Sequence, residues 1–224
     1  MTISARNHQG IGMTSQRTRE RLVGRLRERD ISDERVLDVI RNTPRHLFVE
    51  EALAHQAYDD TALPIGHGQT ISQPWVVARM TELLLALRGS LGRVLEIGTG
   101  CGYQTAVLSP LAEEVYSVER IEPLLKQARS RLTQLRLTNV KLKYADGALG
   151  WPEAAPFDSI LAACARPDIP RELLAQLADG GRLLMPVSTS TNEQWLTLVE
   201  RNGDSFSERR MEPVRFVPFM RGTL

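Results

Sequence analysis

The sequence predicts a doubly wound α/β fold: a mostly parallel sheet covered by helices on both faces, preceded by a helical region and closed by an antiparallel edge. From residue 93 onward, short apolar runs rich in branched residues alternate with helical stretches, as in parallel strands joined by crossover helices. A length of 224 residues, 42% hydrophobic and 25% charged, fits one globular domain. We therefore expect a single domain, 1–224, with a disordered leader (1–13), a helical region (14–88) and an α/β core (89–224).

The N-terminal region shows helical periods after a polar start. Residues 1–12 are polar and lack a helical period, which indicates a disordered leader, or a chain that begins at Met13. Residues 15–30 and 32–42 predict two helices, each opened by a serine. The basic residues between Arg17 and Arg29 alternate with glutamates and leucines at helical spacing, so a solvated amphipathic helix is favoured over a binding arm.

A loop and a third helix complete this region. Residues 63–68 are rich in Gly and Pro and indicate a loop. The next helix is expected over about residues 73–87, with Pro74 in the first turn, where a missing N–H is tolerated. The N-terminal third is therefore expected to be helical.

The core is predicted from five apolar runs and the helical stretches between them. The runs are VLEI, VYSVE, VKLKYAD, FDSILAA and RLLMPV, and the clearest helical stretches are 103–111 and 122–135. Such alternation implies right-handed crossovers and a parallel sheet. After it, WLTLVER and the run that ends in VRFVPF are joined only by the turn residues 202–204, which predicts an antiparallel pair at the edge.

Composition and charge exclude several classes of protein. A net charge of +1 gives no reason to expect nucleic acid, and no apolar run is long enough to cross a bilayer or to serve as a secretory signal. Two cysteines cannot form a disulfide framework, and four dispersed histidines lack the spacing of a zinc site. We expect a cytoplasmic protein without metal, membrane or nucleic-acid partners.

The segment RVLEIGTGCGYQTAVL places glycines at a strand-to-helix junction, where doubly wound sheets bind ligands. Gly98, Gly100 and Gly102, with Thr99 between them, let the backbone approach a ligand closely. The spacing differs from the G-x-G-x-x-G of dinucleotide-binding enzymes, and this difference disfavours the alternative that the protein is a nicotinamide-dependent dehydrogenase. Glu96 would repel a pyrophosphate but attract a cation that carries an amino group and a sulfonium. The pattern is typical of S-adenosylmethionine-dependent methyltransferases, which have a Rossmann-like core.

Further acidic residues follow the next two strands. Glu119 ends the second strand, 23 residues after Glu96, where a carboxylate can accept both ribose hydroxyls. Asp146 ends the third strand before Gly147, where its carboxylate can accept from the adenine amino group while a backbone N–H donates to the ring. Acids at strand ends are often merely solvated, but three in register favour a cofactor site.

Ser72 stands in QTISQPWVVARM, directly before a predicted helix. A nucleophilic role is disfavoured because no histidine stands in a G-x-S-x-G context that would mark a serine nucleophile. Capping of the helix that starts near Gln73 is a sound alternative, and capping does not exclude catalysis.

Several blocks together resemble the protein-L-isoaspartate O-methyltransferase family: PIGHGQTISQPWVVARMTELL, VLEIGTGCGYQTAVL, YSVERI, ADG, APFDSI and VRFVPF. The resemblance covers about residues 13–222 and implies methyl transfer from S-adenosylmethionine to the α-carboxylate of L-isoaspartyl residues, and more weakly D-aspartyl residues, in damaged proteins. It implies that Ser72 is the active-site serine and orients the substrate carboxylate, that Thr70 and Ile71 wall the cavity, and that His67 borders it. Val217 belongs to a terminal strand whose backbone could bind the substrate chain. A monomer is expected.

Three positions depart from the family pattern: Cys101 in the glycine loop, Arg166 in ACARPDIP, and Ser188 after Pro186-Val187. They motivate an alternative, a methyltransferase-like module that binds cofactor or peptide without turnover. A small-molecule carboxyl methyltransferase is a further alternative. Arg166 could attract or crowd the substrate carboxylate, although a solvent-pointing side chain is the simpler interpretation. We also hypothesise that oxidation of Cys101 and Cys164, expected near the same edge of the sheet, obstructs cofactor binding.

Overall fold

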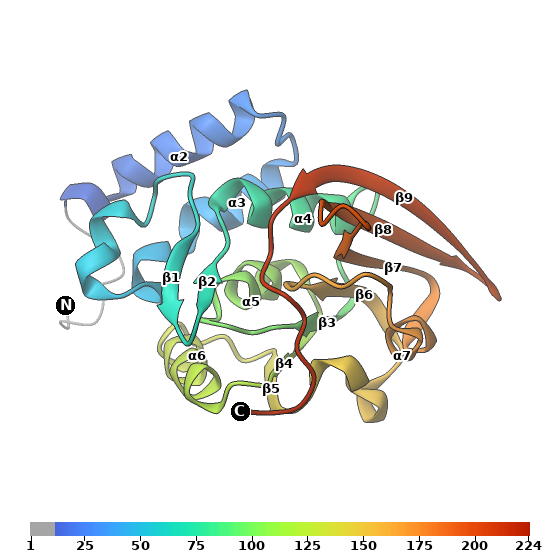
Figure 1. Ribbon diagram of the computed structural model, residues 1–224. Helices are drawn as coiled ribbons and strands as arrows, with labels where there is room; N and C mark the ends of the chain where they lie inside the picture. The colour runs from blue at the N-terminus through green and yellow to red at the C-terminus, as the bar shows by residue number, and fades with distance from the viewer. Residues whose placement is uncertain (1–11) are drawn as a thin grey trace.

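The computed structural model describes residues 12–224 (Figure 1). The predicted leader therefore lies outside the described residues, except for Gly12 and Met13, which belong to the short 3₁₀ turn η1 (Gly12–Thr14) and not to a disordered segment. The centre of the molecule is a seven-stranded sheet with the order β5-β4-β3-β6-β7-β8-β9. This mostly parallel sheet with an antiparallel end confirms the predicted fold class.

The five predicted core strands form the parallel part of the sheet. They are β3 (Arg93–Ile97), β4 (Glu114–Glu119), β5 (Val140–Tyr144), β6 (Phe157–Ala162) and β7 (Leu177–Ser188). The chain moves outward from β3 to β4 and β5, then returns to place β6 on the other side of β3. Strand order reverses at β3 and β6, and ligands of doubly wound sheets bind at the carboxyl ends of the strands at such a point.

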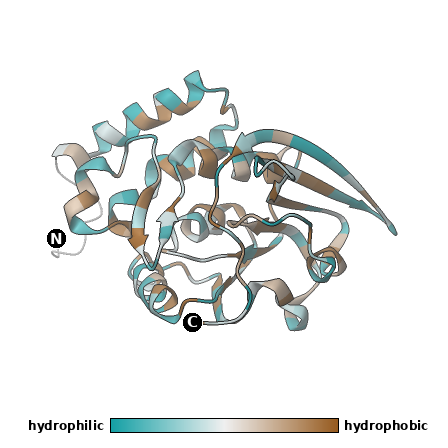
Figure 2. Ribbon diagram, in the orientation of Figure 1, coloured by the Kyte–Doolittle hydropathy of each residue, from teal (hydrophilic) through white to brown (hydrophobic). Residues whose placement is uncertain are grey.

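The edge of the sheet is a long antiparallel hairpin. It consists of β8 (Gln194–Asn202) and β9 (Ser205–Val214), which extend away from the body of the molecule (Figure 1). The predicted turn lies between them, where Gly203 has a positive φ of 59°. Figure 2 shows that β9 is largely hydrophilic, as expected for a strand with one free edge.

The two faces of the sheet are covered by different helices. In β3 the side chain of Val94 joins the cluster that includes α5 (Tyr103–Leu108) and α6 (Glu122–Gln134), whereas Leu95 and Ile97 join the cluster that includes α7 (Arg171–Ala175). Successive side chains of a strand point to opposite faces, so this alternation is the expected one. By the same parity Glu96 faces α5.

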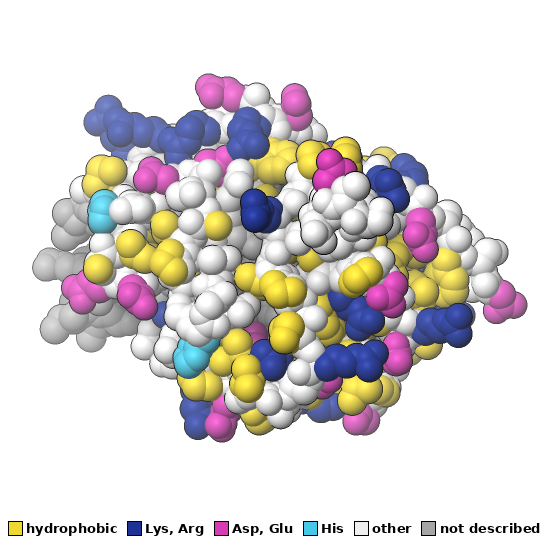
Figure 3. All heavy atoms as spheres, in the orientation of Figure 1, with side chains coloured by type: hydrophobic (Ala, Val, Ile, Leu, Met, Phe, Trp, Pro, Cys, Tyr) yellow, Lys and Arg dark blue, Asp and Glu magenta, His cyan; other side chains and the backbone are white. Residues whose placement is uncertain are grey.

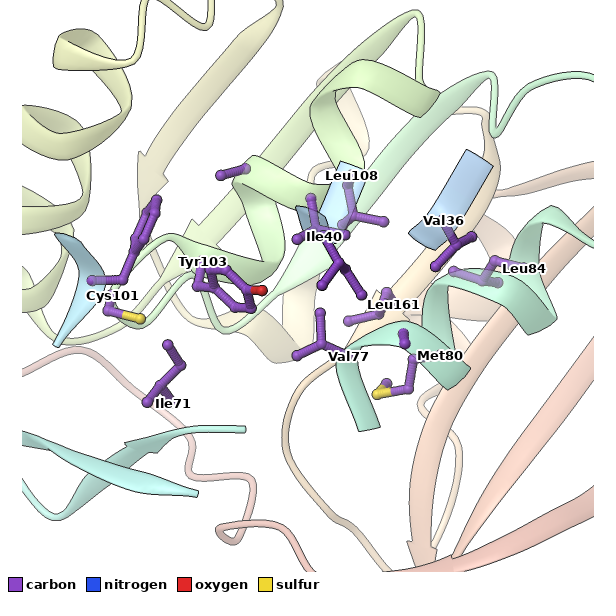
Figure 4. Packing of buried hydrophobic residues seen from close by; sticks show 14 of the residues in the cluster. Val36, Ile40, Ile71, Val77, Met80, Leu84, Cys101, Tyr103, Leu108 and Leu161 are labelled. Atoms are coloured by element: carbon purple, nitrogen blue, oxygen red, sulfur yellow. The ribbon is translucent and has the colours of Figure 1, made fainter. Parts of the chain in front are cut away.

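The N-terminal region packs on the α5 face. It contains α2 (Gln16–Glu28), α3 (Glu34–Asn42) and α4 (Pro74–Leu85), and Figure 4 shows Val36 and Ile40 of α3 and Met80 and Leu84 of α4 beside Leu108 of α5. Full burial of an aliphatic side chain contributes about 1.5–3 kcal/mol. This shared core fixes the N-terminal region against the sheet.

The prediction of a helical N-terminal third is wrong between residues 43 and 73. The 3₁₀ turns η2 (Arg45–Phe48) and η3 (Glu51–Gln56) are followed by a two-stranded hairpin of β1 (Leu63–Gly66) and β2 (Gln69–Ile71). Positive φ angles at the two glycines of the turn and at His67 close the hairpin, so the Gly and Pro signal marked a tight turn between strands and not a loop.

Two predicted helix caps are corrected. The N-cap of α3 is Asp33, whose side chain accepts from Arg35 N at 2.9 Å, and not Ser32. In α4 the N-cap is Gln73 and Pro74 is the first helical residue, so Ser72 lies one residue before the cap. Capping therefore does not account for Ser72.

The chain after β9 crosses the carboxyl ends of the parallel strands in front of the sheet (Figure 1). The predicted terminal strand is wrong beyond Val214, because residues 215–224 are not a strand and make one isolated bridge, between Pro218 and Ala165. Ala165 N donates to Val217 O at 2.9 Å, and Phe219 N donates to Ala165 O at 2.8 Å. We call residues 215–224 the terminal strap.

In residues 12–224 no helix combines the length and the apolarity that crossing a membrane requires.

Candidate active site

A cavity lies at the carboxyl ends of β3, β4 and β6, the position expected from the strand order, and we call it the inner cavity. It encloses about 940 Å³ of empty space, counted with the solvent at its mouth. The glycine loop and the end of β4 form its floor, and residues 70–72 with the strap residues 216–220 form the facing wall. Segments far apart in sequence thus meet around one space.

The glycine loop adopts backbone angles that other residues avoid. Gly98, Gly100 and Gly102 have φ angles of +93°, +54° and +90°. Gly98 N donates to Val118 O at 2.8 Å, which ties the loop to β4, and Gly102 is the N-cap of α5. Gly98 and Gly100 line the cavity with bare backbone, whereas Gly102 lies against Ala128 of α6, outside the lining.

Glu96 is buried beneath this loop. Its Oε2 accepts hydrogen bonds from Thr105 Oγ1 and Ser117 Oγ, each at 2.5 Å, and Ser117 Oγ is in turn 2.6 Å from Thr99 Oγ1. Among the described residues its Oε1 has no hydrogen-bond partner. Burial raises the pKa of Glu96 from its ordinary 4.5 to about 7, and the negative charge of Glu119 adds to the rise, while the two hydroxyls oppose it. Glu96 is fully buried and does not line the cavity, so its predicted role for the cofactor could act only through its charge beneath the glycine loop.

Glu119 is also largely buried, but it borders the cavity. Its Oε2 accepts from Gly100 N at 2.8 Å, and its Oε1 accepts from Arg120 N and Ile121 N, each at 2.9 Å. A carboxylate oxygen can accept two hydrogen bonds, so Oε2 retains capacity for one more donor. Glu119 thus fixes the glycine loop and offers an acceptor to a ligand.

The carboxylate of Asp146 is used locally. Its Oδ1 accepts from Ala148 N at 2.8 Å, and its Oδ2 accepts from Gly222 N of the strap at 2.7 Å. Gly147 lines the cavity and Asp146 does not. A Cβ on Gly147 would lie 2.5 Å from Cγ2 of Ile97, so only glycine fits there. Asp146 places Gly147 and the strap, while its contact with an adenine group stays a prediction.

Ser72 stands on the facing wall, on the segment between β2 and α4. Its side chain is half-buried, and its hydroxyl makes no hydrogen bond to another residue in the described part of the chain. Thr70 and Ile71 line the same cavity, as the sequence predicts. His67 does not: it is exposed at the tip of the β1–β2 hairpin, and its placement beside the cavity was wrong.

The strap forms the rest of the facing wall. Gln194 holds its first part, because Phe216 N donates to Gln194 Oε1 at 2.6 Å and Gln194 Nε2 donates to Phe216 O at 3.2 Å. Val217 lines the cavity, and its carbonyl oxygen accepts from Ala165 N; a contact between this backbone and a substrate chain stays a prediction. Phe216 and Phe219 also line the cavity.

Some residues that line the cavity were not predicted from the sequence. Polar examples are Gln69, Gln104 and Arg120, and apolar examples are Met80 and Met220. Arg120 directly follows Glu119, so the YSVERI block could have indicated it. The others belong to segments whose proximity arises only when the hairpin, α4 and the strap meet.

Two of the three departures from the family pattern, Arg166 and Ser188, make local contacts that account for them. Arg166 does not point to solvent: its side chain is 16% exposed, pairs with Asp168 at 3.2 Å and stacks on the ring of Phe219 at 5.2 Å. It is absent from the cavity lining, so it does not crowd the substrate site. Ser188 N donates to Arg166 O at 2.7 Å, a backbone contact that serine makes as well as glycine.

Cys101 and Cys164 both line the cavity as free thiols. Burial raises the pKa of Cys101 and raises that of Cys164 to about 12, with a further rise from the charge of Glu119. Because the thiolate is the reactive form, these surroundings oppose the hypothesised oxidation. No cluster of three or more His, Cys, Asp or Glu side chains that could hold a metal occurs within residues 12–224.

The sequence profile of a known family matches this chain over residues 17–223: Protein-L-isoaspartate(D-aspartate) O-methyltransferase. The chain belongs to this family. The protein-L-isoaspartate O-methyltransferase of Alcanivorax borkumensis is 71% identical over 215 residues, which cover 96% of this chain and 97% of the relative. The protein-L-isoaspartate O-methyltransferase 1 of Marinobacter nauticus is 59% identical over 216 residues, with 96% and 97% coverage.

Solved structures agree with this membership. A protein-L-isoaspartate O-methyltransferase superposes with a TM-score of 0.78 at 27% identity, covering 89% of this chain and 65% of its own, so the chain spans less than two thirds of that protein's length. A Plasmodium falciparum protein described as a protein-L-isoaspartate O-methyltransferase, solved with S-adenosyl-L-homocysteine, has a TM-score of 0.77 at 23% identity and covers 89% of this chain and 96% of its own. The fold is therefore that of the family.

Proposed function

We propose that this chain repairs damaged proteins by transferring a methyl group from S-adenosylmethionine to the α-carboxylate of L-isoaspartyl residues, and more weakly of D-aspartyl residues. The resulting ester collapses to a succinimide, part of which reopens as normal aspartate. The observation that carries the proposal is that Ser72, from the block specific to the family, lines the same cavity as the glycine loop and Glu119. Family membership and this juxtaposition support it together.

The residues of the floor fit S-adenosylmethionine. Gly98 and Gly100 offer close backbone approach, and the spare lone pair on Glu119 Oε2 suits a ribose hydroxyl. Glu96 does not line the cavity, but a cationic ligand bound above the loop would favour its ionised form, with the unpartnered oxygen as the negative charge beneath that ligand. Thr99 and Gly147 complete the contacts, with Gly102 shaping the loop from outside the lining and Asp146 holding Gly147. The bound cofactor would supply an electrophilic methyl group on a positively charged sulfur.

The facing wall needs only to position the substrate. A carboxylate with a pKa of roughly 3.5–4 is already ionised at neutral pH, so no general base has to remove a proton. The Ser72 hydroxyl donates to one oxygen of this carboxylate and aims the other at the floor. Thr70, Ile71 and Val217 limit where the substrate chain can lie. Holding reacting groups in line supplies up to about 7–11 kcal/mol of a barrier in model reactions, so positioning is sufficient as the main contribution.

We further propose that the chain works as a cytoplasmic monomer. Both of its cysteines are free thiols, as is usual in a reducing compartment. The two edge strands of the sheet are β5, which carries Lys141 and Lys143, and β9, which carries Glu208, Arg209 and Arg210, and charged side chains on an edge strand oppose pairing with a second sheet. Light scattering after gel filtration should give a mass near the 25.1 kDa of one chain; a mass of twice that value would refute the monomer.

The test of function is methyl transfer from labelled S-adenosylmethionine to a peptide with one isoaspartyl residue, beside a twin peptide with normal aspartate. We expect incorporation into the isoaspartyl peptide alone. Equal incorporation into both peptides, or none into either, would refute the proposal. Binding of cofactor in calorimetry without any transfer would favour the non-turnover module, and transfer to small carboxylic acids alone would favour the small-molecule methyltransferase.

A further inference from the structure

A second cavity opens on the outer side of the facing wall. We call it the outer cavity; it shares Thr70, Ser72, Ala163, Phe216 and Val217 with the inner cavity. Ser72 therefore borders both spaces. On the proposed function, the reacting carboxylate enters the inner cavity, and the outer cavity on the other side of Ser72 offers a route for the polypeptide chain attached to it.

Two arginines line the outer cavity. Arg29 follows α2, and its guanidinium stacks on the ring of Trp75 at 4.6 Å while pairing with Asp60. Arg215 belongs to the strap; it is exposed and has no acidic partner among residues 12–224. A chain that leaves the reaction site through this opening passes beside these positive charges and the apolar side chains of Trp75 and Phe216, which also line it.

Arg29 is also the last member of a row. Arg17, Arg21 and Arg25 precede it at intervals of four residues, which places them along one side of α2. Figure 3 shows Lys and Arg side chains gathered over α2. Arg17 and Arg21 are exposed and, within the described residues, make no ion pair. The net charge of the four arginines of the row stays positive even after the negative charges of Glu28 and of Asp60, which pairs with Arg29, are counted.

The row has the length of a short peptide segment. Twelve residues of α-helix separate Arg17 from Arg29, a distance of about 18 Å at 1.5 Å per residue. An extended chain rises about 3.3 Å per residue, so the row matches about five or six residues of substrate. A chain that emerges beside Arg29 can therefore follow the row with several of its side chains.

We propose that the arginine row and the outer cavity form a docking surface for acidic polypeptide segments that adjoin the isoaspartyl residue. The partner is a damaged protein or peptide with several Asp or Glu residues within about six positions of the lesion. The row favours encounter and residence of such substrates, while Ser72 and the floor act on every isoaspartyl residue alike. A nucleic acid is the less suitable occupant, because the surface adjoins Ser72, whose proposed substrate is a polypeptide carboxylate.

The experiment compares isoaspartyl peptides of equal length whose flanks are acidic, neutral or basic, with the acidic flank placed before the lesion in one peptide and after it in another. We expect kcat/KM to be about three- to tenfold higher for at least one acidic peptide than for the neutral one, through KM and not kcat, the size expected for a few exposed ion pairs. The preference should shrink as salt rises from 50 to 500 mM, a range over which roughly 10 Å of screening length falls to a few ångströms.

The variant R17E/R21E reverses two exposed charges of the row without touching either cavity lining. It should lose the acidic preference and keep the kcat of the neutral peptide. The matched control, R129E/R210E, makes the same change in net charge at two exposed arginines outside both cavity linings, and it should keep the preference.

Three outcomes would overturn the docking surface: no acidic preference in the unaltered protein, an equal loss in both variants, or tighter competition by a single-stranded oligonucleotide than by an acidic peptide of equal charge. Failure of the proposed function is distinguishable from these results, since it would appear as no methyl transfer to the neutral isoaspartyl peptide.

Discussion

The floor of the inner cavity and the wall that faces it satisfy their polar groups in different ways. In the floor, Glu96 and Glu119 are almost fully buried and are bound by hydroxyls and backbone N–H groups from β4, α5 and the glycine loop. In the wall, the Ser72 hydroxyl has no partner among the described residues, and the strap is held mainly through its backbone. The floor is organised before any ligand binds, and the wall keeps the Ser72 hydroxyl free.

This difference suits the two ligands. The cofactor is the same molecule in every cycle, so a rigid floor whose acceptors are already in place can bind it without rearranging. The substrate chain differs from one damaged protein to the next, so a wall that offers one free hydroxyl and backbone groups can accept many sequences. Changes in the floor should therefore act on cofactor binding and stability, and changes in the wall on turnover.

The largest effect is expected from Glu119→Gln. An amide has one acceptor oxygen, so its NH₂ group must face either Gly100 N or the N–H groups of Arg120 and Ile121, and an unsatisfied buried group costs about 1–3 kcal/mol. With the lost charge, we expect the Kd of the cofactor in calorimetry to rise at least about a hundredfold. Glu114→Gln at the partly exposed start of the same strand, outside the cavity lining, is the control and should leave the Kd within about twofold. A normal Kd for Glu119→Gln would break the assignment of this acid to the floor.

Ser72→Ala should lower kcat by roughly ten- to a hundredfold, the value of one hydrogen bond to a charged group, while the Kd of the cofactor stays nearly unchanged. Since Ser72 is not the cap of α4, its removal should leave the melting temperature within about 2 °C. Ser130→Ala on the exposed side of α6 serves as the control. A lower melting temperature with a normal kcat would instead show that Ser72 has a structural role.

Glu96→Gln separates charge from shape in the floor. The folded-state pKa of Glu96, about 7, lies above its ordinary 4.5, so the stabilising effect of its protonated form is fully present below pH 4.5 and is lost as pH rises through 7. Between pH 5 and pH 8 the unaltered protein should lose up to about 3 kcal/mol of unfolding free energy through this group, a loss that Glu96→Gln should lack.

Urea unfolding of both proteins at the two pH values measures this difference, because other titrating groups are shared and cancel in the comparison. The variant should also bind the cofactor about tenfold more weakly, since the negative charge beneath the loop is gone. If the two proteins show the same pH dependence, Glu96 is ionised at all these pH values and the account of the floor is wrong.

The smallest effect is expected from Tyr103→Phe. The Tyr103 hydroxyl is buried, and Figure 4 shows it pointing into the apolar cluster. The buried guanidinium of Arg45 lies over its ring at 4.8 Å, but the hydroxyl makes no well-aligned hydrogen bond within the described residues. Removing it should therefore change the unfolding free energy by less than about 1 kcal/mol. Tyr116→Phe is the contrasting control, because that hydroxyl donates to Glu114 at 2.8 Å and its loss should destabilise the protein by about 1 kcal/mol. A large loss of stability from Tyr103→Phe would show a partner that the structure does not contain.

Much of the fold could be predicted because local patterns specify it. The structure confirmed the sheet that was predicted from the apolar runs of β3 to β7 and from the turn at Gly203. Branched residues and turn residues favour their conformations through the backbone next to them, so their effect can be read from the sequence. The β1–β2 hairpin was missed because its strands are three or four residues long, too short for an alternating pattern to show. The end of β9 was missed because residues beyond Val214 leave the sheet to cross the cavity, a route that their apolar character does not reveal.

By itself the sequence determined the succession of strands and helices along the chain from residue 93, the glycine loop and the family. Each of these depends on residues that are neighbours in the chain or on blocks that can be compared directly. Only the tertiary structure decided which of those residues share a space. It placed Arg45 wholly inside the protein, over the ring of Tyr103 at 4.8 Å with its Nε bound to Ala57 O, and it brought Ser72, Glu119 and the strap around one cavity. Burial and long-range contact set the pKa of Glu96 and the free hydroxyl of Ser72, and neither quantity exists until distant segments have packed together.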